Sequence, residues 1–225
     1  MRYKACTPDN LAFLRTRTSS LAPGRSSICD DNFRNVSIIT GTNLHKDKIN
    51  RLGAIQFAEE TNQTLTHFYS DDSVKVNLKD TNSSDECKVK YLASLTNETQ
   101  AAFWEMPPSS TDKHIPGVLP LCIGMPVTIC YNYATELCLT HGQEGYVVRW
   151  QAKQGSRQQQ VLDVLFIELK NSPSTIKIDG LPENVVPVYP TTRTVQAMLP
   201  GGNKYYLQRK QVEVLINFAM TDFAS

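Results

Sequence analysis

The chain has 225 residues, of which 40% are hydrophobic and 20% are charged, and its formal net charge is +1. This balance is typical of a globular protein, and the near-neutral charge excludes a global basic field, so a nucleic-acid site would need a local cluster. No apolar stretch reaches the roughly 18 residues of a membrane-spanning helix, and the first residues form no secretory leader. We therefore expect an intracellular protein without a membrane partner.

The cysteines indicate neither a metal centre nor a disulfide framework. They form no C-x-x-C pair, and no histidine pair follows at zinc-finger spacing, so we expect no metal site. Scattered cysteines without a leader are typical of a reducing compartment. Three of them recur every eight residues across expected strands and are interpreted as small core residues. The six are Cys6, Cys29, Cys87, Cys122, Cys130 and Cys138.

The first half of the chain predicts helices around one short strand. Thr7, Pro8 and Asp9 are typical of a helix start, with a capping hydroxyl, a proline and an acid in order. Residues 36–40 predict a buried β-branched strand. After a two-residue loop, Asn43 is expected to cap a helix to about Thr61. The inner stripe of that helix is expected to be Leu44, Ile49, Leu52, Ile55 and Ala58.

The character of the sequence changes near Pro116. Before it, polar residues 71–88 predict an exposed excursion, and residues 88–105 predict a helix. Beyond it, strands are short and turn signals are frequent, which favours a small antiparallel barrel or sandwich. The expected strands cover residues 119–121, 126–131, 136–140, 146–152, 161–170, 175–178 and 194–199. The sequence thus predicts an incomplete α/β layer followed by a small β module, with an apolar core element from Val212 onward.

The loop after the first strand is the leading candidate site. Ligands bind at the carboxyl ends of strands in α/β sheets, and helix N-termini offer free amides to anions. A hydroxyl and a lysine beside those amides are suited to hold a phosphate of single-stranded DNA in the intact parent. The preferred interpretation is that Asn43 only caps the helix and Lys46 is solvated. The residues concerned are Thr42, Asn43, His45 and Lys46.

Basic residues interleaved with aromatic ones suggest a second DNA-facing surface. Rings stack on bases while cations meet phosphates, which is how proteins hold single strands. The same alternation is typical of a half-buried strand, so packing is the preferred interpretation and DNA contact is the alternative. The candidate cations are Arg149, Lys153, Lys204 and Arg209, and the nearby aromatic residues are Trp150, Tyr205 and Tyr206.

No catalytic residue is predicted. The chain has no G-x-x-x-x-G-K-[ST] loop to hold a nucleotide phosphate, and no nucleophile elbow accompanies its four histidines. Asp85 and Glu86 follow polar residues rather than a hydrophobic strand, so they are interpreted as a solvated patch instead of a magnesium site. We expect no cofactor for this chain.

Four segments in order resemble the Pif-type DNA helicases of superfamily one, in the version carried by fungal Helitron-like mobile elements. They are VSIITGTNLHKDKIN at residues 36–50, GAIQFAEETNQTLTHFY at 53–69, LPLCIGMPV at 119–127 and QVEVLINFAMTDFAS at 211–225. The resemblance implies a partial second RecA-like domain over residues 1–115. It implies a Src-homology-3-like barrel insert over 116–210 and a return to the RecA-like sheet over 211–225.

The parent reaction implied is ATP-driven 5′→3′ unwinding, with Mg-ATP as cofactor, single-stranded DNA as partner and a nuclear location. A coupling segment, Gln-Gly-x-Thr, and an arginine finger would follow Ser225, and the N-terminal helicase domain would precede Met1. The chain alone is expected to be inactive, with at most weak single-strand binding. Two alternatives stay open: a protein-interaction module on the β part, and an inert fragment that does not fold stably.

Overall fold

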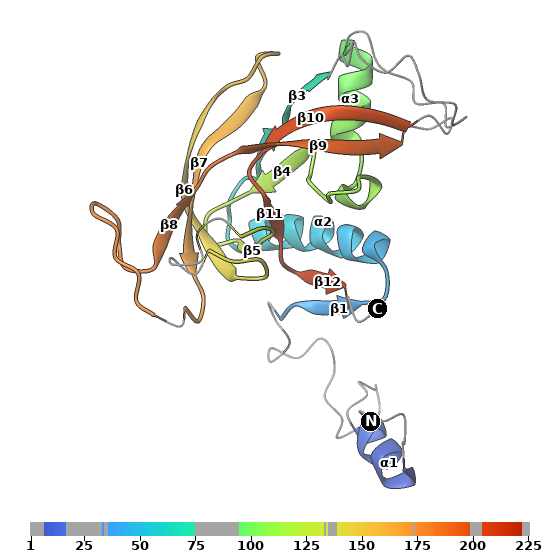
Figure 1. Ribbon diagram of the computed structural model, residues 1–225. Coiled ribbons are helices and arrows are strands. Elements are labelled where there is room, and N and C mark those ends of the chain that lie inside the picture. Colours follow the sequence, from blue (N-terminus) through green and yellow to red (C-terminus); the bar gives the residue numbers. More distant parts are fainter. Residues whose placement is uncertain are drawn as a thin grey trace. The chain divides into compact units, whose positions relative to one another are not determined.

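The computed structural model describes residues 7–16, 33, 36–74, 95–132, 134, 139–172, 174–198 and 204–221 (Figure 1). The chain has two compact units, Met1–Val36 and Ser37–Ser225. The described part of the first unit is essentially one helix, α1 (Pro8–Thr16), with no buried residue. Thr7 caps it as expected, because its Oγ1 accepts the amide of Asn10 at 3.3 Å.

The second unit begins with a strand, a helix and a pair of short strands. These are β1 (Ile38–Thr40), α2 (Asn43–Glu60), β2 (Thr66–Tyr69) and β3 (Asp71–Val74). Next come α3 (Asn97–Glu105), the 3₁₀ helix η2 (Pro108–Ser110), β4 (Val118–Leu121) and β5 (Pro126–Ile129). The remaining strands are β6 (Glu144–Gln154), β7 (Gln160–Leu169), β8 (Val185–Val188), β9 (Thr191–Met198), β10 (Lys204–Gln211), β11 (Val214–Ile216) and β12 (Ala219–Thr221).

The described strands form four sheets. β1 and β12 pair in parallel, β2 pairs with β4, and the larger sheets have the orders β3-β10-β9 and β11-β5-β6-β7-β8. The mixed α/β class is therefore confirmed. No sheet among the described residues closes on itself, so the expected barrel is not seen in them. The most extended element is the β6–β7 hairpin, which stands out from the rest of its sheet (Figure 1).

Several observed elements differ from those predicted from the sequence. Residues 175–178 form no strand, whereas β8 and β10 were not predicted. The excursion expected from residue 71 starts as β3, in which Asp72 is buried. Asp85 and Glu86 lie outside the described residues, as does the first part of the helix expected over 88–105.

Helix α2 has the expected length but the wrong face was predicted to be buried. Its buried residues are Lys46, Asn50, Ala54 and Ala58. Of the five expected inner residues only Ala58 is buried, Ile49 is half-buried, and Leu44, Leu52 and Ile55 are 67%, 56% and 41% exposed. The reason is close packing: a Cβ on Gly53 would lie 2.6 Å from the Phe218 ring, so small residues must face β12. Strand β1 was also expected to be buried, but Ile39 is 67% exposed.

Nearly all of the main hydrophobic core lies between α2, the β2–β4 pair and the inner face of the five-stranded sheet. Phe68, Leu121, Val127 and Ile167 are wholly buried there, and Cys122 lies in the same cluster as a small core residue. None of the helices in the described ranges is long and apolar enough to cross a membrane. Within the same ranges, no three His, Cys, Asp or Glu side chains gather where they could hold a metal ion.

The thiol of Cys130 should react slowly in the folded protein. Burial raises its pKa to about 12, and the negative charge of Glu213 acts in the same direction. The thiolate is the nucleophile, so a raised pKa leaves roughly 10⁻⁴ of the thiol reactive at pH 8. Iodoacetamide labelling followed by peptide mass spectrometry should be roughly a thousandfold slower in native protein than in urea. Equal rates in the two states would contradict this prediction.

Candidate nucleic-acid interface

The candidate loop lies where two parallel strands end together. Because β1 and β12 run in parallel, with Thr40 opposite Thr221, their carboxyl ends meet at one edge beside the start of α2 (Figure 1). The hydroxyl of Thr40 donates to the carbonyl oxygens of Thr42 at 3.0 Å and Met220 at 3.4 Å. The edge that α/β sheets use for ligands is therefore present, and hydrogen bonds hold its loop in place.

Thr42, not Asn43, caps the helix. Thr42 has extended backbone angles, and its Oγ1 accepts the amide of His45 at 3.3 Å. Asn43 is instead the first helical residue, and its side-chain oxygen accepts a hydrogen bond from the hydroxyl of Thr221 at 3.1 Å. The expected cap was therefore displaced by one residue, because the hydroxyl of Thr42 satisfies the third amide while Asn43 links the helix to β12.

Lys46 does not face the solvent. It is 4% exposed, and its ammonium lies 3.8 Å from a carboxylate oxygen of Asp47. The other oxygen of Asp47 accepts the amide of Ser109 at 2.9 Å, which ties α2 to η2. Burial lowers the pKa of the nearby His114, and the positive charge of Lys46 lowers it further. The expectation that Lys46 is solvated or meets phosphate is corrected, since the lysine is buried beside Asp47, the residue that binds η2.

Asn50 is the residue of this region that the sequence analysis missed. It is 8% exposed and forms three hydrogen bonds with β12 and the residue before it. Its amide nitrogen donates to the carbonyl of Ala219 at 3.0 Å, and its oxygen accepts the amides of Phe218 at 2.9 Å and Ala219 at 2.7 Å. A polar residue one turn before Ala54 and two turns before Ala58 is the only sequence signal that marks it.

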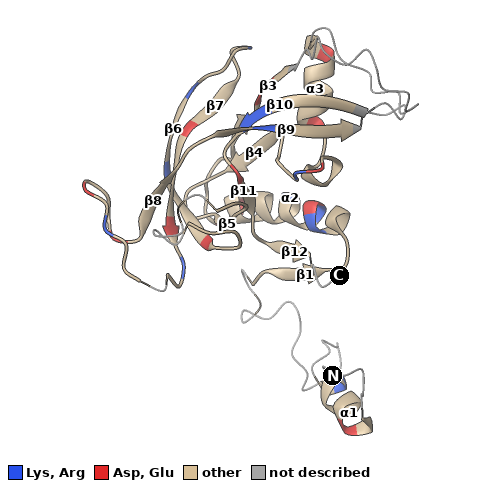
Figure 2. Ribbon diagram, viewed as in Figure 1, with Lys and Arg blue, Asp and Glu red and all other residues tan. Residues whose placement is uncertain are grey.

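The candidate cations of the β part have separate roles. Arg149 is exposed and stacks on the Phe166 ring at 4.2 Å, and Lys153 pairs with Asp163 across the hairpin. Lys204 begins β10, opposite Met198. Figure 2 shows the described Lys and Arg residues scattered over several elements rather than gathered on one. The structure therefore brings Thr42, Asn43 and His45 together but adds no basic cluster from this group.

Arg209 is a structural residue, which corrects its assignment as a DNA contact. Its guanidinium is 1% exposed and forms a two-bond pair with Asp72, at 3.1 and 2.9 Å. Trp150 packs edge-on against Phe68, and Tyr205 packs against Phe103. For Arg209, Trp150 and Tyr205 the packing interpretation is confirmed, because each side chain contacts a buried residue of the core.

The solved structures similar to this chain include Pif1 helicases. Pif1 helicase from Candida albicans is 13% identical over 96% of this chain and 40% of its own, with a TM-score of 0.48. Bacteroides Pif1 in complex with ADP-AlF3 and single-stranded DNA is 14% identical over 98% of this chain and 37% of its own, with a TM-score of 0.46. The chain thus spans about two fifths of these proteins. No protein-family model and no curated protein matches it.

Proposed function

We propose that this chain is part of an ATP-dependent 5′→3′ DNA helicase of the Pif type, and that its own contribution is contact with single-stranded DNA. The four segments that resemble these helicases support the assignment. The Helitron-like version, the nuclear location and the Mg-ATP cofactor of the parent are parts of the same proposal. The chain has no phosphate-binding loop with a Gly-Lys pair, so ATP hydrolysis would depend on another part of that parent.

The domain division follows from the same segments. In this proposal residues 1–115, with β1 and α2, belong to the second RecA-like domain. Residues 116–210, which run from β4 to β10, supply the insert of the Src-homology-3 type, and residues 211–225 return to the first sheet, where β12 pairs with β1. The N-terminal motor domain is a partner that the proposal requires. The observation that carries the DNA contact is the capped start of α2 at the joint edge of two parallel strands.

The DNA contact is made by outward groups of that loop. Thr42 and His45 are exposed, and the first backbone amides of α2 have no carbonyl partner within the helix. A helix N-terminus attracts anions because its amides and its dipole both favour negative charge. This arrangement suits a single phosphate of a DNA strand, so binding should be weak and sensitive to salt. A phosphate contact does not discriminate between bases, so binding should not depend on the DNA sequence.

Replacing His45 with glutamate should weaken DNA binding without lowering the stability of the fold. Glutamate three residues after Thr42 completes a capping box, so the free energy of unfolding should stay unchanged or rise by about 0.3–1 kcal/mol. The same carboxylate repels phosphate, so the affinity for a single-stranded oligonucleotide should fall about tenfold in a low-salt anisotropy titration. The plot of log affinity against log salt should become shallower by about 1.

His67→Glu is the matched control. His67 is also exposed, lies on β2, and gives the same change in net charge. It should leave the affinity within about twofold. If both variants weaken binding equally, the effect is one of overall charge, and the loop is not the contact. If the unaltered protein shows no salt-dependent binding, the proposed DNA contact is wrong.

A further inference from the structure

A cleft of about 310 Å³ lies between the tip of the β6–β7 hairpin and the edge where β2, β3 and β10 meet. Its apolar lining residues, called the floor below, are Tyr69, Val161, Leu162 and Pro190. Lys153, Lys210 and Asp71 also line the cleft. It shares no residue with the loop at the start of α2. A concave site that combines apolar side chains with a few polar and charged groups is typical of small-ligand pockets.

Hydrogen bonds and close packing hold the hairpin wall of the cleft in place. Gly155 fits there because a Cβ would lie 2.5 Å from the Gln159 side chain and 2.8 Å from Val161. The tip is fastened to β3 by hydrogen bonds from Ser156 and Gln159 to the same oxygen of Asp71. Arg157 fastens it to the start of α3 by donating to Asn97 at 2.6 Å. The wall is therefore formed before any ligand arrives.

The floor is also fixed in place. The Tyr69 ring packs edge-on against Trp104, with ring centres 4.8 Å apart. The indole nitrogen of Trp104 donates to the carbonyl of Ser70 at 3.1 Å. Gln211 is 2% exposed and uses its side chain on the backbone of Phe68 and Val212. An aromatic ring held in this way offers a stacking surface at little entropic cost.

Lys210 and Asp71 retain unused hydrogen-bonding capacity. They are cross-strand partners on β10 and β3, yet no ion pair joins them. Among the described residues, Lys210 has no carboxylate within ion-pair distance, and the second oxygen of Asp71 has no hydrogen-bond donor. The cleft thus presents a cation, an acceptor and an aromatic floor together.

We propose that this cleft binds a nucleotide. The base lies on the Tyr69 floor, Asp71 accepts a hydrogen bond from an exocyclic amino group, and Lys210 pairs with the phosphate. The amino group makes cytosine or adenine a better fit than thymine, which offers a carbonyl at that position. The nucleotide is either free or one unit of a single strand. The assignment does not rest on the helicase proposal.

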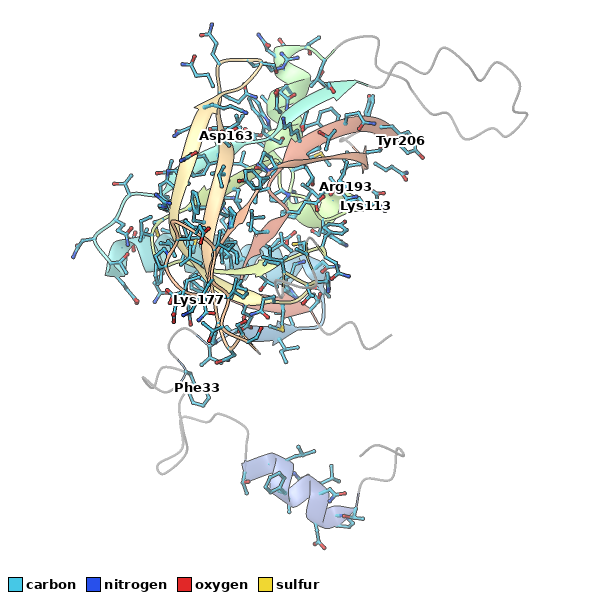
Figure 3. All side chains as sticks on the ribbon, turned by 60° about the vertical axis from the view of Figure 1, so that its left-hand side comes forward. Phe33, Lys113, Asp163, Lys177, Arg193 and Tyr206 are labelled. Carbon is cyan, nitrogen blue, oxygen red and sulfur yellow. The ribbon has the colours of Figure 1, made fainter. Side chains whose placement is uncertain are left out.

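Calorimetric titration of the whole chain with dCMP, dTMP, deoxycytidine and inorganic phosphate tests the cleft. We expect dCMP to bind saturably and more tightly than dTMP, and to shift the amide resonances of Gly155, Ser156 and Gln211. Lys210→Gln should weaken dCMP about tenfold and leave deoxycytidine unchanged. Lys177→Gln is the control, because Lys177 is exposed and lies far from the hairpin that carries Asp163 (Figure 3).

An oligo-dC of eight nucleotides distinguishes a free nucleotide from one unit of a single strand as the ligand. If it binds and shifts the same amides while dCMP alone does not, the cleft holds one unit of a strand. If dCMP binds, a free nucleotide suffices. The proposal is overturned if neither ligand shifts these amides, if inorganic phosphate binds as tightly as dCMP, or if Lys177→Gln weakens binding as much as Lys210→Gln. His45→Glu should leave dCMP binding unchanged, so failure of the loop and failure of the cleft are separable.

Discussion

Replacing Asp72 with asparagine should lower the free energy of unfolding by about 3–5 kcal/mol, because it leaves the buried charge of Arg209 without its counterion. Both side chains are at most 1% exposed. Arg209 also donates to the carbonyl oxygens of Ile115 at 3.0 Å and Phe103 at 3.2 Å, and Gln100 donates to Asp72 at 3.1 Å. This network joins β3, β10 and α3, so denaturant unfolding monitored by circular dichroism should report its loss.

Two further variants show whether the loss comes from the unpaired charge. Glu183→Gln removes the partner of Lys177 in an exposed pair and should cost less than about 1 kcal/mol. The double variant Asp72→Leu with Arg209→Met removes both buried charges and should recover most of the stability lost in Asp72→Asn. A double variant as unstable as Asp72→Asn would show that packing, not charge, is what the asparagine disturbs.

Arg209 also shows why the sequence misled about this surface. Its strand alternates tyrosine, lysine and glutamine with leucine and arginine, which is typical of an exposed basic strand. The partner that buries the arginine is Asp72, 137 residues earlier in the chain. No local pattern contains that pairing. The polar content of β10 also explains why it was not predicted, since its inward positions carry Arg209 and Gln211 as well as Leu207.

Elements could be located more reliably than their faces or neighbours. The cap at Thr42 and the length of α2 depend on local chemistry, so the start of the helix was predicted within one residue. The face that α2 buries depends on how closely β12 approaches, and Gly53 and Ala54 permit that approach. Likewise, the strands of the β part were mostly placed, but their division among separate sheets depends on pairings far apart in sequence.

The same reasoning makes Asn50 a support of the candidate loop. It holds the backbone of Phe218 and Ala219, and β12 in turn holds Asn43 through Thr221. The expected face of the helix would have placed only apolar residues against the sheet. The polar side chain is needed there because a two-stranded sheet leaves backbone groups of β12 without a neighbouring strand, and buried groups of that kind must be satisfied.

Replacing Asn50 with leucine should therefore lower the free energy of unfolding by about 2–4 kcal/mol, because leucine has a similar size but leaves those backbone groups without a partner. Hydrogen exchange should accelerate at residues 219–221 more than in the core strands. Leu52→Asn is the control: this position is 56% exposed, and the change should cost less than about 1 kcal/mol.

The Asn50→Leu variant also tests how the loop acts on DNA. Asn50 is buried and therefore does not contact DNA itself. Any weakening of single-stranded DNA binding must come from a change in the position of Asn43 and Thr42. If exchange accelerates and the affinity falls, the loop binds as a preorganised unit. If hydrogen exchange accelerates while the affinity for DNA stays the same, the dipole and the backbone amides at the start of α2 are sufficient for binding, and support from β12 is not needed. If neither changes, the three hydrogen bonds of Asn50 do not hold β12 in place.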